Sequence, residues 1–140
     1  MFLPDVNVWL AMAFAAHVHH AVARNWFDGL SSDMASLCRM TQQGFLRLAT
    51  NQRVVQADAV TLPGAWRMYD AFLADPRVFF SDEPAGVEPI WRGYTQGETF
   101  TPMVWNDAFL AAFAQAAGYE LVTFDKGLTR FTNVKCTILS

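Results

Sequence analysis

The sequence contains little charge and almost no cysteine. Of its 140 residues, 13 are Asp or Glu and 10 are Lys or Arg, so the formal net charge is −3. A protein that holds nucleic acid by neutralising many phosphates carries a clear basic excess, which excludes that class except through a local basic patch. Cys38 and Cys136 lack metal-ligand spacing and are too few for a disulfide scaffold. They indicate a reducing compartment, and we therefore expect a cytoplasmic protein.

Long uninterrupted apolar runs are also missing. The apolar stretch at residues 2–18 contains Asp5 and Asn7 and has no basic leader, which argues against a signal peptide and against a membrane span. Apolar residues are otherwise abundant, at 53% hydrophobic and 14% aromatic. This length and composition predict one folded domain, residues 1–140. The apolar excess also predicts a surface patch that binds a partner, such as a second copy of the chain.

Short buried runs alternate with segments of helical spacing. Strands are predicted at residues 2–5, 34–38, 77–80, 120–124 and 136–139. Helices are predicted at residues 17–30, 41–49, 63–74, 87–94 and 105–117. Thr41 is expected to cap the second helix, and residues 81–101 to form an exposed, irregular connection around the fourth. Because parallel neighbours need a crossover that a helix usually supplies, the order predicts an α/β domain with a mainly parallel sheet.

Three aspartates stand where such a fold brings side chains together. Asp5 and Asp125 follow predicted strands, at the edge where open α/β sheets bind ligands, and Asp107 lies in the first turn of a helix. Three neighbouring carboxylates repel one another unless protons or a cation relieve the charge. A hard divalent cation such as Mg²⁺ or Mn²⁺ does so, activates a water and stabilises charge on phosphorus. The spacing fits phosphodiester hydrolysis. It fits equally well three aspartates with no common role: Asp5 in a turn, Asp107 at a helix start and Asp125 in a loop.

The residues around these acids resemble the PIN family. The resemblance is carried by Asp5-Val-Asn7-Val-Trp-Leu, by Asp107-Ala-Phe-Leu-Ala-Ala and by Leu121-Val-Thr-Phe-Asp125-Lys-Gly-Leu128. The middle segment, residues 38–51, is similar to a stretch of VapC-type toxins. Each motif is modestly specific, but together they extend over nearly the whole chain, from Phe2 to Leu139.

The resemblance implies a three-layer α/β/α domain with endoribonuclease activity. It implies a Mg²⁺- or Mn²⁺-dependent toxin of a type II toxin-antitoxin module, which cleaves RNA with a metal-activated water, forms a homodimer and is silenced by a VapB-type antitoxin. By position, the resemblance implies that Asp5, Asp107 and Asp125 bind the metal. It also implies that Asn7 orients Asp5 or a metal-bound water, and that Thr123 supports the site by hydrogen bonding.

One position departs from the family pattern. Many members carry a glutamate where this chain reads Thr41-Gln42-Gln43-Gly44, and no acid occurs between Met34 and Ala57. We assign the position to Gln42, whose amide can bind a metal or its water but adds no negative charge, so weaker metal binding is expected. The alternative is a catalytically weak or inactive PIN scaffold that acts as a protein-binding module.

Other candidates are weaker. A phosphatase of the haloacid dehalogenase class also places an Asp after its first strand. The motif of that class resembles Asp-x-Asp, however, whereas position 7 of this chain is Asn. Arg47 and Lys126 are the cations expected near the acids, more to offset their charge than to contact a scissile phosphate. The histidines at 17, 19 and 20 are expected to face solvent or a partner, and Trp105 is the best candidate for stacking on a base.

Overall fold

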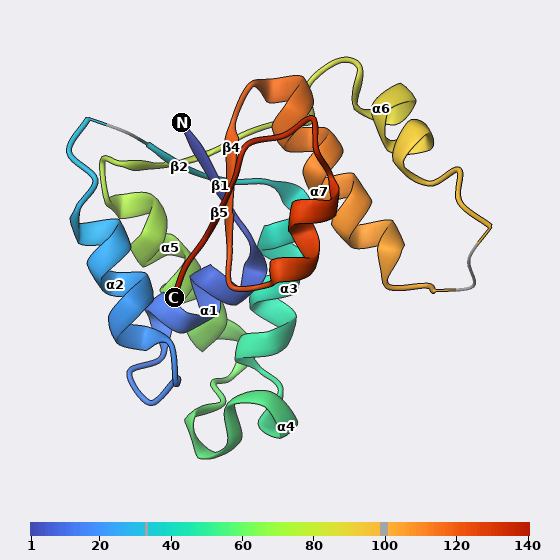
Figure 1. The fold of residues 1–140 in the computed structure, drawn as a ribbon. Coiled ribbons are helices and arrows are strands. Elements are labelled where there is room, and N and C mark those ends of the chain that lie inside the picture. Colours follow the sequence, from blue (N-terminus) through green and yellow to red (C-terminus); the bar gives the residue numbers. More distant parts are fainter. Residues whose placement is uncertain (33, 99–100) are drawn as a thin grey trace.

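A five-stranded parallel sheet forms the centre of the molecule in the computed structural model, which describes residues 1–32, 34–98 and 101–140. The strand order is β3-β2-β1-β4-β5, and each neighbouring pair is parallel. The strands are β1 Phe2–Pro4, β2 Ala35–Leu37, β3 Val78–Phe80, β4 Glu120–Thr123 and β5 Cys136–Ile138. Each lies within a predicted strand, so the expected α/β class is confirmed (Figure 1).

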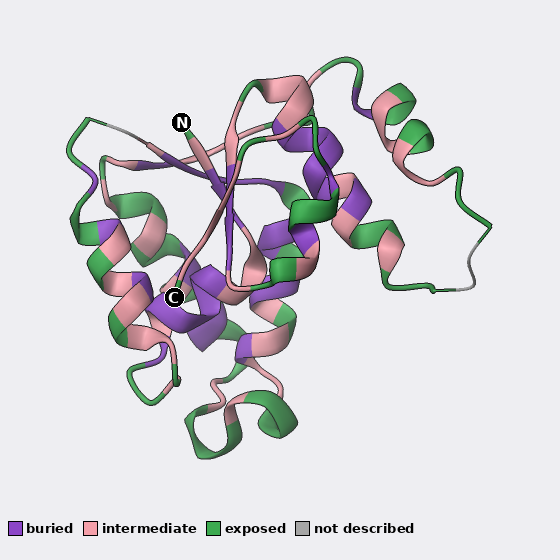
Figure 2. Ribbon diagram, in the orientation of Figure 1, coloured by how far each residue is buried: buried purple, intermediate pink, exposed green. Residues whose placement is uncertain are grey.

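Helices cover both faces of this sheet. They are α1 Val6–Ala13, α2 His20–Asp28, α3 Arg39–Ala49, α4 Gln52–Val55, α5 Leu62–Ala74, α6 Val87–Tyr94 and α7 Val104–Ala117. Successive strand residues point to opposite faces. Accordingly, Val122 belongs to a core cluster with residues of α1, α2, α3 and α5, and Leu121 to a second cluster with α7. The buried residues on either side of the sheet give the expected three layers (Figure 2).

The first helix, α1, has no counterpart among the predicted elements. Its N-cap is Asp5, whose Oδ1 accepts a hydrogen bond from the Val6 backbone N–H at 2.7 Å. Its five consecutive residues Val8 to Met12 are all buried. A helix buried on all sides has no amphipathic stripe, and helical periodicity therefore fails to identify it.

The start of α3 also differs from the prediction. The helix begins at Arg39 with Cys38 as its N-cap, so Thr41 is not the capping residue. The Thr41 hydroxyl instead accepts a hydrogen bond from the Cys38 backbone N–H at 2.9 Å, as in a capping box. The polar segment after α3 contains α4 and a 3₁₀ turn, η1 Gln56–Asp58.

Helix α6 has the predicted bounds and packs on α7 through aromatic side chains. The rings of Trp91 and Phe109 meet edge to face, with centroids 5.1 Å apart. Two residues of the expected irregular connection, 99 and 100, lie outside the described residues. No helix in the described ranges is long and apolar enough to cross a membrane.

Candidate active site

The acids stand where β1 and β4 end. These strands are neighbours, with Pro4 paired to Val122, and the Asp5 backbone N–H donates to the Val122 carbonyl at 2.8 Å. Asp5 follows β1 directly, and Asp125 follows β4 by two residues. The first turn of α7, the helix that leads into β4, carries Asp107. Segments more than 100 residues apart are therefore joined at the carboxyl edge of the sheet.

The buried hydroxyl of Thr123 connects the two strand ends. It donates to Asp5 Oδ2 at 2.9 Å, and it accepts from Asn7 Nδ2 at 3.2 Å and from the Asp125 backbone N–H at 3.0 Å. A hydroxyl has one proton and two lone pairs, so Thr123 uses its full hydrogen-bonding capacity here. The expectation that Thr123 organises the site thus has a direct geometric basis, which spacing alone could not supply.

Asn7 holds the same junction from α1. Its Nδ2 donates to Thr123, and its Oδ1 accepts from the Phe124 backbone N–H at 3.4 Å. No hydrogen bond from Asn7 to an acid is found in the described part of the chain. Asn7 therefore acts on Asp5 through Thr123, rather than by direct contact.

The charges of the three acids influence one another. Burial raises the pKa of Asp5, the hydrogen bonds from Thr123 and Val6 oppose this shift, and the charges of Asp107 and Asp125 add to it. Burial likewise raises the pKa of Asp107, which Asp125 raises further and Arg130 lowers. Mutual repulsion of this kind marks an excess of negative charge at one place, which a bound cation would relieve.

A hollow of about 260 Å³ opens beside Asp5 and Asp107, between α3 and the start of α7, and Asp125 is not among the residues that line it. Asp5 and Asp107 line it together with Gln43, Arg47 and Asn106. Apolar residues complete the lining: Val6, Met40, Gly44, Met103 and Leu110. The hollow therefore offers oxygen atoms, amides and one arginine against an apolar wall.

This chain is similar to known proteins. A family model described as PIN domain matches residues 2–134. The chain is 41% identical to Ribonuclease VapC41 of Mycobacterium tuberculosis over all of this chain and 99% of that protein. It is 34% identical to Ribonuclease VapC38 of the same organism over 91% of this chain and 87% of that one. The chain belongs to the PIN-domain family.

Solved structures support the fold of this PIN domain. VapC20 of Mycobacterium tuberculosis, described as a sarcin-ricin loop cleaving toxin, superposes with a TM-score of 0.69 at 13% identity, over 100% of both chains. A chain from VapBC2 of Rickettsia felis, solved with a DNA fragment from its promoter, gives 0.73 at 14% identity over 99% and 98%. At such low identities these likenesses concern the fold alone. PIN-domain ribonucleases of the VapC class generally depend on a divalent metal.

The PIN domain places Gln43, not Gln42, in the acidic hollow. Gln42 is buried, its Oε1 accepts from Arg39 Nη1 at 2.5 Å, and a hydrogen bond links it to Tyr69 of α5. Gln43 is the neighbour that lines the hollow with Asp5. The hollow therefore does not include Gln42, the residue assigned from the sequence, because α3 turns that side chain toward α5.

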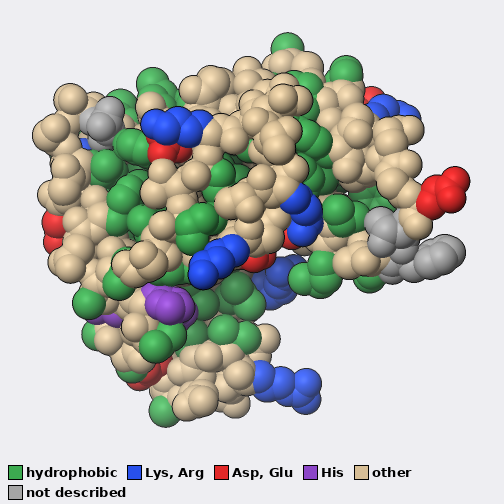
Figure 3. All heavy atoms as spheres, viewed as in Figure 1, with side chains coloured by type: hydrophobic (Ala, Val, Ile, Leu, Met, Phe, Trp, Pro, Cys, Tyr) green, Lys and Arg blue, Asp and Glu red, His purple; other side chains and the backbone are tan. Residues whose placement is uncertain are grey.

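Cations surround the acids of the PIN domain. Figure 3 shows Lys and Arg side chains on both sides of a largely covered acidic group, where β4 ends. Arg130 Nη2 lies 3.0 Å from Asp107 Oδ2, an ion pair that the sequence analysis did not anticipate. The only sequence signal for this ion pair is the position of Arg130, five residues after Asp125. Arg47 lines the hollow and forms no ion pair within the described ranges. Lys126 is exposed beside Asp125.

The donor set suits a hard cation, although it is not arranged as a finished cage. Carboxylate and amide oxygens are the ligands that Mg²⁺ and Mn²⁺ prefer. Within residues 1–32, 34–98 and 101–140, no three His, Cys, Asp or Glu side chains are already grouped around one point. Two of the acids are engaged elsewhere, since Asp107 pairs with Arg130 and Asp125 Oδ1 accepts from the Gly127 N–H at 2.8 Å.

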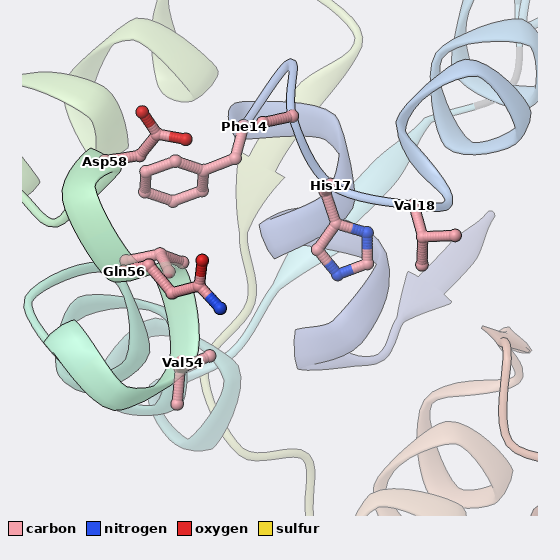
Figure 4. A pocket seen from close by; sticks show the side chains of 8 residues that line it. Phe14, His17, Val18, Val54, Gln56 and Asp58 are labelled. Carbon is pink, nitrogen blue, oxygen red and sulfur yellow. The ribbon is translucent and has the colours of Figure 1, made fainter.

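The histidines stabilise the turn before α2. The His17 Nδ1 accepts from the His19 backbone N–H at 3.1 Å, and the His19 ring stacks on Phe124 at 4.4 Å. His17 also lines a separate hollow of about 300 Å³, together with Phe14 and Asp58 (Figure 4). None of the three site acids lines that hollow.

The other aromatic candidate is not part of the acidic hollow. Trp105 is 54% exposed, and its ring packs edge to face on Trp91 of α6. It does not line the hollow that contains Asp107, two residues away. Base stacking by Trp105 at the acids therefore has no geometric support.

Proposed function

We propose that this protein cuts RNA at its three aspartates, with Asp5, Asp107 and Asp125 as the ligands of Mg²⁺ or Mn²⁺. The observation that carries the proposal is that Asp5 and Asp107 line one hollow at the carboxyl edge of the sheet, while Thr123 forms hydrogen bonds with both Asp5 and the backbone of Asp125. The protein is a toxin ribonuclease of the VapC class, since full-length relatives at 41% identity carry that name. The metal, when bound, activates a water and stabilises the charge that develops on phosphorus.

The protein's own groups hold the acids and shape the approach. Thr123 fixes Asp5 through one hydrogen bond and the backbone of Asp125 through another. Asn7 keeps Thr123 in place and, because it also binds the Phe124 N–H, ties α1 to the end of β4. Met40 and Leu110 form the apolar wall of the hollow on the α3 and α7 sides.

Arg47 is the residue we assign to the RNA backbone. It lines the same hollow as Asp5 and is exposed, whereas Arg130 already offsets the charge of Asp107. Its guanidinium can form two parallel hydrogen bonds to a phosphate, which would orient the phosphodiester beside the acids. This role differs from the charge-offsetting role that we expected from the sequence.

An antitoxin and a second copy of the chain are the proposed protein partners. Solved structures of similar fold include toxin-antitoxin assemblies, among them FitAB bound to DNA. We assign a VapB-type antitoxin on this basis and on the VapC relatives. Several large apolar side chains are exposed and could be covered by such partners: Val18, Leu62, Trp66, Met103 and Trp105.

Conservative replacement of two acids tests the proposed chemistry. Asp5→Asn and Asp125→Asn should each reduce RNA cleavage by roughly 100-fold or more while the circular dichroism spectrum stays unchanged, because the amide keeps its size but loses the charge. Asp70→Asn, at an exposed acid of α5, is the matched control and should cleave normally. Unchanged cleavage in both site variants would refute the assignment.

The alternative, an inactive scaffold, is favoured by the absence of an acid from Thr41-Gln42-Gln43-Gly44, where many family members carry a glutamate. A calorimetric Mn²⁺ titration distinguishes the two functions. The nuclease should bind Mn²⁺, and its Asp5→Asn variant should bind it more weakly. No binding at millimolar Mn²⁺ would favour the scaffold.

A further inference from the structure

Arg130 places a fixed positive charge inside the acidic site. Its Nη2 lies 3.0 Å from Asp107 Oδ2, and the two side chains are 48% and 30% exposed. Asp107 also feels the charge of Asp125, so this carboxylate has one repelling and one attracting neighbour. A half-exposed pair of this kind is weak enough to open, because water can replace each partner.

The turn that carries Arg130 is tied to the site itself. It is η2 Lys126–Arg130, which follows Asp125 directly and is capped by that residue's Oδ1. The turn is anchored by Leu128, which is fully buried, and the guanidinium lies 4.8 Å over the Phe131 ring. Arg130 is therefore presented to Asp107 from a rigid support, not from a mobile loop.

The ion pair occupies one of the acids that line the hollow. Asp107 lines the hollow with Asp5, yet its Oδ2 is engaged by Arg130. A divalent ion that used this oxygen would stand close to the guanidinium, and the two positive charges would repel each other. The metal and Arg130 therefore compete for Asp107.

We propose that Arg130 is a built-in substitute cation, which holds Asp107 in the metal-free protein and must release it when the divalent metal binds. The inference rests on the proposed metal role of Asp107. Arg130 is thus a positioning residue that stabilises the empty site at the cost of metal affinity. Loading then requires a higher metal concentration than the acids alone would need.

Calorimetric Mn²⁺ titration of Arg130→Gln tests the competition. The variant should bind Mn²⁺ about 10-fold more tightly than the wild type, because a repelling charge has been removed. Its Tm without metal should fall, and the rise in Tm on adding Mn²⁺ should be larger than in the wild type. The control is Arg24→Gln, which removes an exposed pair to Asp28 at 3.2 Å and should change neither quantity.

Arg130→Lys provides a second variant that keeps the charge. A lysine is shorter and offers a single point charge. The Mn²⁺ affinity of Arg130→Lys should therefore lie between those of the wild type and Arg130→Gln. Unchanged or weaker Mn²⁺ binding in both variants would overturn the competition. Absence of Mn²⁺ binding in the wild type would instead overturn the metal assignment, so the two failures are distinguishable.

Discussion

Two of the hollows in the described part of this molecule have similar volumes, and they differ in what lines them. The one between the α1–α2 turn and α4 measures about 300 Å³. Asp58 is the single acid among its lining residues, and His17 also lines it. The one at the carboxyl edge of the sheet measures about 260 Å³ and is lined by Asp5, Asp107 and Arg47. Volume alone would favour the first hollow as the functional site, whereas the chemistry of the lining residues favours the second.

The difference lies in how each hollow is built. The larger one is formed by the α1–α2 turn, the short helix α4 and the turn η1. The smaller one lies where the end of β1 meets α3 and α7, so groups from distant parts of the chain come together, and Thr123 holds Asp5 there by a hydrogen bond. A site that depends on fixed geometry is better supported by a sheet edge than by a turn.

Apart from the acids themselves, the largest effect should come from the hydroxyl that connects the strand ends. Thr123→Val keeps the shape but removes three hydrogen bonds, to Asp5, Asn7 and Asp125. Cleavage should fall roughly 10- to 100-fold, as for residues that orient ligands, and stability by about 2 kcal/mol. RNA cleavage assays and urea unfolding measure both. Thr95→Val, which removes a hydroxyl bonded within α6, should leave cleavage intact; equal losses in the two variants would contradict the special role of Thr123.

A smaller effect is expected at the cation of the acidic hollow. Arg47→Gln should weaken RNA binding about 10-fold and lower its salt dependence, because one charge-assisted phosphate contact is lost. Fluorescence anisotropy in an Asp5→Asn background measures binding without cleavage. Arg67→Gln, an exposed arginine of α5, is the matched control. If both variants bind RNA as the parent does, Arg47 has no part in holding the substrate.

The wall between α3 and α1 offers a test through packing. A Cβ at Gly44 would stand 2.7 Å from Val6 Cγ2, so Gly44→Ala must displace Val6, the neighbour of Asp5. We expect a loss of about 1–3 kcal/mol in unfolding free energy, with reduced cleavage. The double variant with Val6→Ala should recover part of the stability. Gly93→Ala, where a Cβ meets nothing within 4 Å, should cost nothing; an equally stable Gly44→Ala would show that the contact is not tight.

The smallest effect belongs to the larger hollow. Asp58→Asn should leave RNA cleavage within about twofold of the wild type, since an exposed surface substitution away from the acids perturbs little. The same cleavage assay applies. A loss comparable to that of Asp5→Asn would reverse the comparison and move the site to the α1–α2 turn.

Local patterns were sufficient for the sheet and for two of the acids. Strand ends can be predicted from short apolar runs, and in a parallel sheet all of these ends lie at one edge, so Asp5 and Asp125 could be expected to meet. The α7 periodicity likewise placed Asp107 in a first turn. These features depend on neighbours within a few residues, which a sequence displays directly.

Tertiary packing decided the rest. Helix α1 is buried on all sides and shows no period, and only the packing of α3 on α5 turns Gln42 inward and leaves Gln43 at the hollow. The pairing of Arg130 with Asp107 joins positions 23 residues apart across two elements. Such contacts depend on the rotation of one element against another, and no spacing along the chain encodes that angle by itself.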